Sequence, residues 1–275
     1  MTVINTNVSA LRAQNNSRVA NQMQSQAMER LSSGKRINAA KDDAAGLAIA
    51  TRMDAAARGM TQAIRNANDG ISLAQTADSA AGSISDILVR MRELALQAST
   101  GTNGATDRGA IKTEVDALIS QIGDVASRAT FNGNTLINGG TSTTAGFDIQ
   151  TGLNATEVVN IKIANLNATG LGVATLDFTD AADASAALAT LDTALQTVAT
   201  ERANLGAQQN RLSSAVDNLT SGVTNLAESK SRIEDADFSV ESTNLAAAGI
   251  LSQASTAMLA QANQSSQGVM NLLRG

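Results

Sequence analysis

The sequence predicts a mainly α-helical protein: an elongated rod of long antiparallel, coiled-coil-like helices with a small β-hairpin element and terminal helices that order on polymerisation. Three observations predict this class. Apolar residues recur at helical spacing over long segments, a central segment alternates with period two, and both ends carry weak Ala-rich stripes. Of the 275 residues 43% are hydrophobic but only 1% are aromatic. The predicted core is therefore built from small aliphatic side chains.

The longest periodic segment covers residues 185–234. Alternating steps of three and four from Leu188 reach Ile233 and meet apolar residues at 11 of 14 positions, which is the pattern of a coiled-coil helix. A helix of about 50 residues is about 75 Å long. Since that length exceeds the interior of a compact domain of this size, the pattern predicts a rod.

Two further amphipathic segments accompany it. In residues 60–98 Ala alternates with larger apolar residues along one seam, and Gly101 and Gly104 then end the pattern. A shorter stripe follows in residues 111–125. Each stripe can be buried against the others, so the segments are expected to pack as an antiparallel bundle.

Between about residues 129 and 180 the period changes. Residues 159–163 alternate strictly and residues 147–150 do so more briefly, as half-buried strands do, and glycines punctuate the remainder. We expect a small β-element that projects from the helical rod with exposed polar loops.

The two ends carry apolar stripes with few large side chains. These residues are Ile4, Val8, Leu11, Val19, Met23 and Leu31 near the start, and Leu251, Met258, Val269 and Leu272 near the finish. Apolar burial contributes about 25 cal/mol per Å², whereas ordering costs about 1–2 kcal/mol per residue. We expect both ends to be disordered alone and to become helical by packing against copies of the chain. A local two-helix hairpin is the alternative.

Composition and charge exclude most enzyme chemistry. The absence of His and Cys removes Ser-His-Asp and Cys-His nucleophiles and thiolate or imidazole metal sites, so no cofactor is expected. A net charge of −5 is a poor match to nucleic acid. The first 60 residues hold eight basic and four acidic side chains, against 12 and 21 in the rest. This asymmetry suits either end-to-end packing of subunits or solvated helix faces.

No run of 18 apolar residues predicts a transmembrane helix. Residues 1–7 lack the basic and apolar regions of a secretory signal peptide. From the residues alone, the chain is expected to be cytoplasmic.

Asp42 and Asp43 precede an Ala-rich helical segment, where acidic side chains stabilise a helix N-terminus by about 0.3–1 kcal/mol. We expect both to cap that helix. A carboxylate pair can also bind a metal, but no third ligand accompanies it here. The run Ser32-Ser33-Gly34 predicts the end of the first helix, with Gly34 in the left-handed conformation.

Motifs at both ends resemble the terminal regions of bacterial flagellins. The N-terminal motifs are Val3-Ile4-Asn5-Thr6-Asn7, Glu29-Arg30-Leu31-Ser32-Ser33-Gly34-Lys35-Arg36-Ile37-Asn38 and Ala40-Lys41-Asp42-Asp43-Ala44-Ala45-Gly46, and the C-terminal motifs are Arg232-Ile233-Glu234-Asp235-Ala236-Asp237-Phe238 and Ala260-Gln261-Ala262-Asn263-Gln264. The resemblance covers residues 1–137 and 185–274. It implies a short form that lacks the large outer variable domains.

The resemblance implies a structural subunit of the flagellar filament rather than an enzyme, which self-assembles head to tail into a helical tube rotated as a propeller for motility. Residues 1–40 plus 236–275 would line the filament channel, residues 41–130 plus 181–235 would form the central helical rod, and residues 131–180 the surface-exposed insert. Ser and Thr side chains in residues 141–156 are candidates for O-linked sugars, an unmodified polar loop being the alternative.

The resemblance also implies partners and a location. Besides itself, as a helical homopolymer, the chain would bind the flagellar type III export apparatus, an export chaperone, the filament cap and hook-associated proteins, but no nucleic acid and no membrane. It would be secreted and extracellular, in the flagellum filament. A hook–filament junction protein and a monomeric secreted helical adhesin remain as alternatives.

Residues 90–97, Arg90-Met91-Arg92-Glu93-Leu94-Ala95-Leu96-Gln97, resemble the flagellin stretch that is bound by the vertebrate Toll-like flagellin receptor. Arg90 and Leu94 lie four residues apart on one helix face, and Glu114 falls where the family has an acidic contact. The resemblance implies that these side chains are exposed in the monomer and are packed between subunits in the filament.

Overall fold

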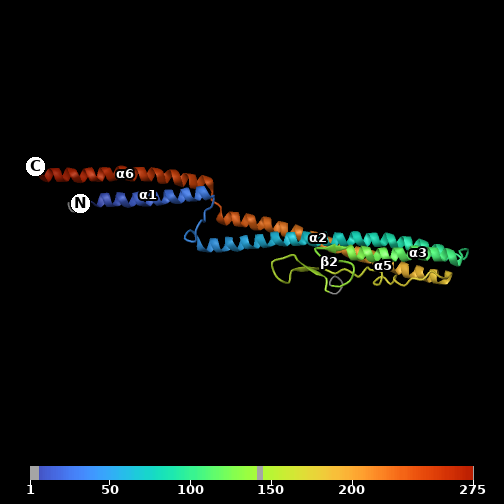
Figure 1. Cartoon of the computed structure of the whole chain (residues 1–275). Helices are drawn as coiled ribbons and strands as arrows, with labels where there is room; N and C mark the ends of the chain where they lie inside the picture. Colours follow the sequence, from blue (N-terminus) through green and yellow to red (C-terminus); the bar gives the residue numbers. More distant parts are fainter. Residues whose placement is uncertain (1–5, 141–144, 275) are drawn as a thin grey trace. The chain divides into compact units, whose positions relative to one another are not determined.

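The computed structural model describes residues 6–140 and 145–274, with residues 269–274 described as helix backbone only. The described residues are mainly helical, as the apolar periodicity predicts. The helices are α1 (Val8–Ser33), α2 (Ala44–Ala98), α3 (Ala105–Arg128), α5 (Ala181–Glu234) and α6 (Phe238–Arg274), and the strands are β1 (Thr130–Phe131), β2 (Asn134–Thr135), β3 (Phe147–Gln150) and β4 (Val158–Ile161) (Figure 1). Among the described residues, no helix is long and apolar enough to cross a bilayer.

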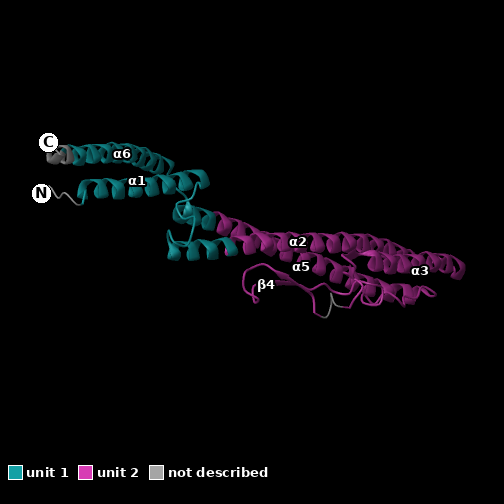
Figure 2. Ribbon diagram, turned by 60° about the vertical axis from the view of Figure 1, so that its left-hand side comes forward, with its two compact units in different colours: residues 1–55, 225–275 teal, residues 56–224 magenta. Residues whose placement is uncertain are grey.

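The chain divides into two compact units (Figure 2). The terminal unit comprises residues 1–55 and 225–275, and the central unit comprises residues 56–224. The division falls inside α2 and α5, so the first turns of α2 and the last turns of α5 belong with the chain ends. The predicted layers change instead near residues 40 and 235. Contacts such as Lys230 Nζ to Asp54 Oδ1, at 2.5 Å, explain why these turns group with the terminal unit.

In the central unit α2 and α5 run antiparallel. Arg202 Nε lies 2.8 Å from Asp78 Oδ1, and Arg92 Nε lies 2.6 Å from Asp192 Oδ1, so positions rise along α2 as they fall along α5. Within residues 188–223 the predicted seam of α5 is buried or half-buried, except at Arg202, whose guanidinium pairs with Asp78. The coiled-coil prediction is confirmed.

Helix α3 adds the third member of this bundle. The turn at residues 99–104 ends α2 where Gly101 and Gly104 predict a break, and the Asp107 carboxylate accepts a hydrogen bond from Gly104 N at 3.1 Å. Ile111, Val115 and Ile122 of α3 are buried in the same hydrophobic core as α2 and α5. Each helix therefore buries its stripe against the others.

The β-element consists of two small antiparallel pairs. Strands β3 and β4 pair with Phe147 opposite Ile161, as the alternation predicts. Strands β1 and β2 form a second hairpin that sequence reasoning missed. Its turn is Asn132-Gly133, with φ of 49° and 81°, and an Asn-Gly pair in this conformation is the strongest short hairpin signal.

The segment that follows β4 contributes to the core, which corrects the prediction of a mainly projecting element. Ile163, Leu166, Val173 and Phe178 are fully buried and belong to the core cluster of α2, α3 and α5. In a helical bundle dominated by Ala, these larger side chains fill space that small residues leave open. The predicted glycan candidates at 141–144 lie outside the described residues, whereas the loop at residues 151–157 is mostly exposed.

The connector between α1 and α2 is fixed by local hydrogen bonds. Gly34 ends α1 with φ of 70°, as predicted. Asp43 Oδ1 accepts a hydrogen bond from Gly46 N at 2.8 Å, so Asp43 caps α2. Asp42 does not: its Oδ2 accepts from Asn38 N at 3.2 Å and from Ala39 N at 3.0 Å. The predicted role of Asp42 as a helix cap is therefore wrong, because its carboxylate closes the preceding turn.

Candidate self-assembly interface

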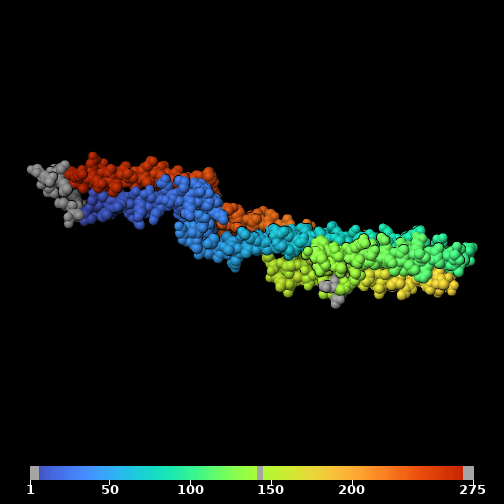
Figure 3. All heavy atoms as spheres, viewed as in Figure 1, coloured from blue at the N-terminus to red at the C-terminus, as the bar shows by residue number. Residues whose placement is uncertain are grey.

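Helices α1 and α6 lie side by side in the terminal unit, and their surfaces adjoin along the pair (Figures 1 and 3). The buried residues of α1 are Ala13, Ala20 and Ala27, and those facing them along α6 are Ala248, Ser255 and Ala262. Both sets recur every seven residues, so each helix presents one narrow stripe of small side chains. Small side chains permit close approach of two helices but bury little apolar area.

Polar contacts fix the antiparallel register of this pair. Asn7 Nδ2 donates to Ala262 O at 3.0 Å, and Ser252 Oγ donates to Asn21 Oδ1 at 3.0 Å. At the end of the pair beside the connector, Arg30 Nη1 lies 2.9 Å from the buried carboxylate of Glu241. The structure thus forms the local two-helix pair that sequence reasoning held as the alternative. Whether the pair orders only on polymerisation stays a prediction.

The predicted polymerisation residues are placed mainly on the outside of this pair. Val8, Leu11, Val19, Met23, Leu251 and Met258 are exposed, and Leu31 is half-buried. Ile4 lies outside the described residues, and the side chains of Val269 and Leu272 are not described. Large apolar residues therefore point to solvent in the single chain while Ala fills the contact, which is the reverse of a helix pair stabilised by its own core.

Helical geometry gathers five of these residues on one side of the pair. Each residue turns about 100° around the helix axis, which places Val8, Val19 and Met23 of α1 on one flank of its Ala stripe. The same rotation on antiparallel α6 places Leu251 and Met258 on the matching flank. We call these five exposed residues the apolar face.

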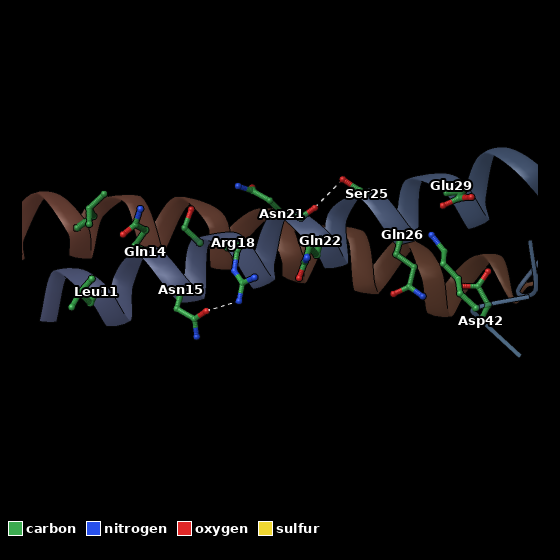
Figure 4. A pocket seen from close by; sticks show the side chains of 13 residues that line it. Leu11, Gln14, Asn15, Arg18, Asn21, Gln22, Ser25, Gln26, Glu29 and Asp42 are labelled. Carbon is green, nitrogen blue, oxygen red and sulfur yellow. Dashed lines mark hydrogen bonds between the residues drawn. The ribbon is translucent and has the colours of Figure 1, made fainter. Parts of the chain in front are cut away.

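The outer side of α1 carries a polar groove. Figure 4 shows a groove along α1 in which amide side chains predominate, together with Arg18, whose Nη2 donates to Asn15 Oδ1 at 3.0 Å. Its lining comprises Leu11, Gln14, Asn15, Ser17, Arg18, Asn21, Gln22, Ser25, Gln26 and Glu29 of α1, Lys41 and Asp42 of the connector, and Leu259 of α6. The terminal pair therefore carries a hydrogen-bonding groove along the outer side of α1, while the apolar face lies on one flank of the α1–α6 contact, together with exposed Arg12.

An alternating chain of charges joins the connector to α5 within the terminal unit. Lys35 Nζ lies 2.6 Å from Glu234 Oε1, Glu234 Oε2 lies 3.8 Å from Lys230, and Lys230 lies 2.5 Å from Asp54. The hydrogen bond to buried Glu234 is the main cause that raises the pKa of Lys35. Two hydrogen bonds from backbone amides lower the pKa of the Asp42 carboxyl nearby in the sequence. Both charged forms are stabilised in the folded connector.

In the central unit, the three residues of the predicted packing and receptor site have different environments. Arg90 is exposed and its Nη2 lies 2.8 Å from Glu114 Oε1 of α3, so these two predicted residues are brought together. The exposure predicted for Leu94 is wrong: its residue is only 3% exposed and belongs to the core cluster. A position four residues along a helix shares a face only approximately, and here α2 turns Leu94 inward.

Among the described residues, the acidic side chains do not cluster as a metal site would require. There, no group of three or more His, Cys, Asp and Glu side chains could hold a metal ion.

Sequence reasoning missed the small-residue stripe, although the recurrence of Ala every seven residues in α1 was a usable signal. The predicted stripes instead contain the large apolar residues, most of which lie on the exposed surface of each helix.

Comparisons with known proteins agree on one family. A family model of the bacterial flagellin N-terminal helical region matches residues 4–143, and one of the C-terminal helical region matches residues 188–273. The flagellin of Xenorhabdus nematophila is 41% identical, with 99% of each chain covered. The flagellin of Halalkalibacterium halodurans is 42% identical over 99% of this chain and 100% of its own.

A solved structure gives the same result at the level of the fold. The crystal structure of Bacillus cereus flagellin superimposes with a TM-score of 0.51 at 38% identity, covering 60% of this chain and 94% of that one. The matches thus include both helical termini and the full length of two relatives. With its paired terminal helices and its central helical bundle, this chain belongs to the bacterial flagellin family.

Proposed function

We propose that this chain is the structural subunit of a flagellar filament and that its terminal pair, α1 with α6, is the principal surface through which copies assemble. The observation that carries the proposal is the inverted arrangement of that pair: small residues fill the contact within one chain, and the apolar face is left in solvent. Burial of such side chains favours association. A contact that repeats from copy to copy without closing produces a filament.

The magnitude of this effect follows from the exposed side chains. Fully burying a Val, Leu or Met side chain contributes about 1.5–3 kcal/mol, and about 1.4 kcal/mol corresponds to a tenfold change in an association constant. The five residues of the apolar face are 42–62% exposed, so burying what remains exposed contributes about 4–7 kcal/mol to association, from which the loss of translational and rotational freedom is subtracted.

Seeded polymerisation of the full-length chain tests this proposal. Val19→Ser together with Leu251→Ser should raise the critical concentration by about tenfold or more, without changing the helical circular dichroism of the monomer. Gln22→Ser is the matched control, since it shortens an exposed side chain in the groove and leaves the apolar face intact. If the protein stays monomeric both with and without seeds, the result would instead support a monomeric adhesin.

We infer a secondary role for the exposed ion pair of Arg90 with Glu114 as a contact between neighbouring subunits and, on the same surface, with a Toll-like flagellin receptor. The support is the exposure of both charges on adjoining helices and the resemblance of residues 90–97. Arg90→Ala should weaken polymerisation and receptor signalling. If it changes neither, this surface has another role.

Family membership also supports the remaining partners. Secretion through the flagellar export apparatus, an export chaperone, and contacts with the cap and hook-associated proteins accord with a filament subunit outside the cell. Residues 1–40 plus 236–275 are proposed to line the channel, residues 41–130 plus 181–235 to form the surrounding rod, and residues 131–180 to lie at the outer surface. Each assignment predicts a contact that crosslinking within purified filaments can locate.

A further inference from the structure

The methionines of this chain have a distinctive distribution. There are eight Met and no Cys, so thioethers are its only sulfur groups. Met91 is fully buried, and Met53 and Met60 are half-buried. Among the methionine side chains that the structure describes, three are exposed: Met23 at 42%, Met28 at 53% and Met258 at 62%. All three lie on α1 or α6.

Two of the three belong to the apolar face. Met23 on α1 and Met258 on α6 flank the same side of the small-residue stripe, beside Val19 and Leu251. Met28 follows buried Ala27 by one residue, and a rotation of about 100° places it on the side of the polar groove. The three thioethers therefore meet the same solvent, but only two occupy the surface proposed to become buried.

Oxidation changes the character of an exposed thioether. When a hydroperoxide such as hydrogen peroxide reacts with methionine, the sulfur attacks one peroxide oxygen, an S–O bond forms and the O–O bond breaks. The departing oxygen takes up the proton of the S–OH group, so the sulfur is oxidised by two electrons and hydrogen peroxide is reduced to water, or an organic hydroperoxide to its alcohol. The product, methionine sulfoxide, is polar and disrupts Met-containing interfaces, and reductases reverse it.

We propose that Met23 and Met258 are modification sites at which a hydroperoxide switches off self-assembly of the free subunit. The inference rests on the proposed function, because it requires the apolar face to be the assembly surface. A sulfoxide on that face must lose water on burial without gaining a designed hydrogen-bond partner. Once the face is covered by a neighbouring copy, the same thioethers are shielded, so the free subunit is sensitive and the assembled one is protected.

The test uses purified full-length monomer treated with hydrogen peroxide and then freed of it. Peptide mass spectrometry locates each added oxygen, and seeded polymerisation gives the critical concentration. Oxidised wild-type protein should show a critical concentration raised by about tenfold or more, and methionine sulfoxide reductase should restore it. Protein oxidised after polymerisation should carry less oxygen at Met23 and Met258 than at Met28.

Leucine variants separate the sites. Leu keeps an apolar side chain and resists oxidation, so the critical concentration of Met23→Leu/Met258→Leu should be the same before and after peroxide treatment, whatever its untreated value, although its Met28 is oxidised. Met28→Leu is the matched control and should remain as sensitive as the wild type. Met23→Gln/Met258→Gln in untreated protein should reproduce the loss, and circular dichroism checks that each variant is helical.

Two results would overturn the inference: oxidised wild-type protein that polymerises like untreated protein, or a double Leu variant that loses assembly after oxidation as the wild type does. The second result would assign the sensitivity to other methionines. Failure of untreated wild-type protein to polymerise on seeds is a separate outcome, and it would remove the proposed function itself.

Discussion

Replacing Leu94 by Ala should destabilise the isolated subunit strongly. The residue is 3% exposed and belongs to the core cluster with Leu88, Met91 and Ala95. Removing a Leu side chain from such a site costs about 2–5 kcal/mol, because the transfer free energy is lost and a cavity remains. Leu96, two residues further along α2, is 58% exposed. Its replacement by Ala should change the free energy of unfolding by less than about 0.5 kcal/mol.

Urea unfolding of the full-length monomer, followed by circular dichroism, measures both effects. With an m-value of about 2 kcal/mol/M, the predicted loss for Leu94→Ala lowers the midpoint by about 1–2.5 M, whereas the midpoint of Leu96→Ala should stay close to that of the wild type. The two substitutions remove the same atoms from the same helix, so they differ only in burial. Equal midpoints would refute the assignment of Leu94 to the core and restore its predicted role as a surface contact.

Three further predictions concern packing and charge. Gly70→Ala should lower stability by about 1–2 kcal/mol, because a Cβ there would lie 2.9 Å from an Ile149 side-chain atom. Gly109→Ala places its Cβ in open space and should raise stability by about 0.5–1 kcal/mol. Thermal unfolding of the two variants compares these effects. Ala20→Leu should open the α1–α6 contact at a cost of about 1–3 kcal/mol, seen as faster amide exchange in α1, while Ala257→Leu on the exposed surface leaves exchange unchanged. The stabilisation from ionised Asp42 should be present above its unfolded-state pKa and disappear as pH falls through its lowered folded-state pKa. The protection factors of the connector amides, which are corrected for intrinsic exchange, should therefore fall in acid, and Asp42→Asn should remove this fall.

The sequence was informative wherever one periodicity acts over many residues. The seam from Leu188 onward predicts α5 because large apolar side chains repeat at coiled-coil spacing, and the alternation before Ile163 predicts β4. Gly34 is equally predictable, since a left-handed residue after a helix favours glycine. These features depend on local geometry, which the chain encodes within a few residues of each position.

What the sequence could not supply depends on which neighbour covers a side chain. Leu94 and Leu96 have the same identity and nearly the same context, and only the placement of the other helices buries one and exposes the other. Asp42 and Asp43 likewise look equivalent as helix caps, yet the path of the connector turns one carboxylate back toward Ala39. The apolar face is unpredictable from the sequence for the same reason, because Met23 and Met258 share a side only once α1 and α6 have paired.

The chemistry of α6 has a consequence for solution conditions. Between Glu241 and Arg274 this helix contains no Asp, Glu, Lys or Arg. Sodium chloride therefore has no charge pair within this stretch of α6 to screen. Salts such as ammonium sulfate act differently, since their exclusion from apolar surface strengthens its burial. Fibre growth along α6 should therefore follow the Hofmeister rank of the added anion more closely than the ionic strength.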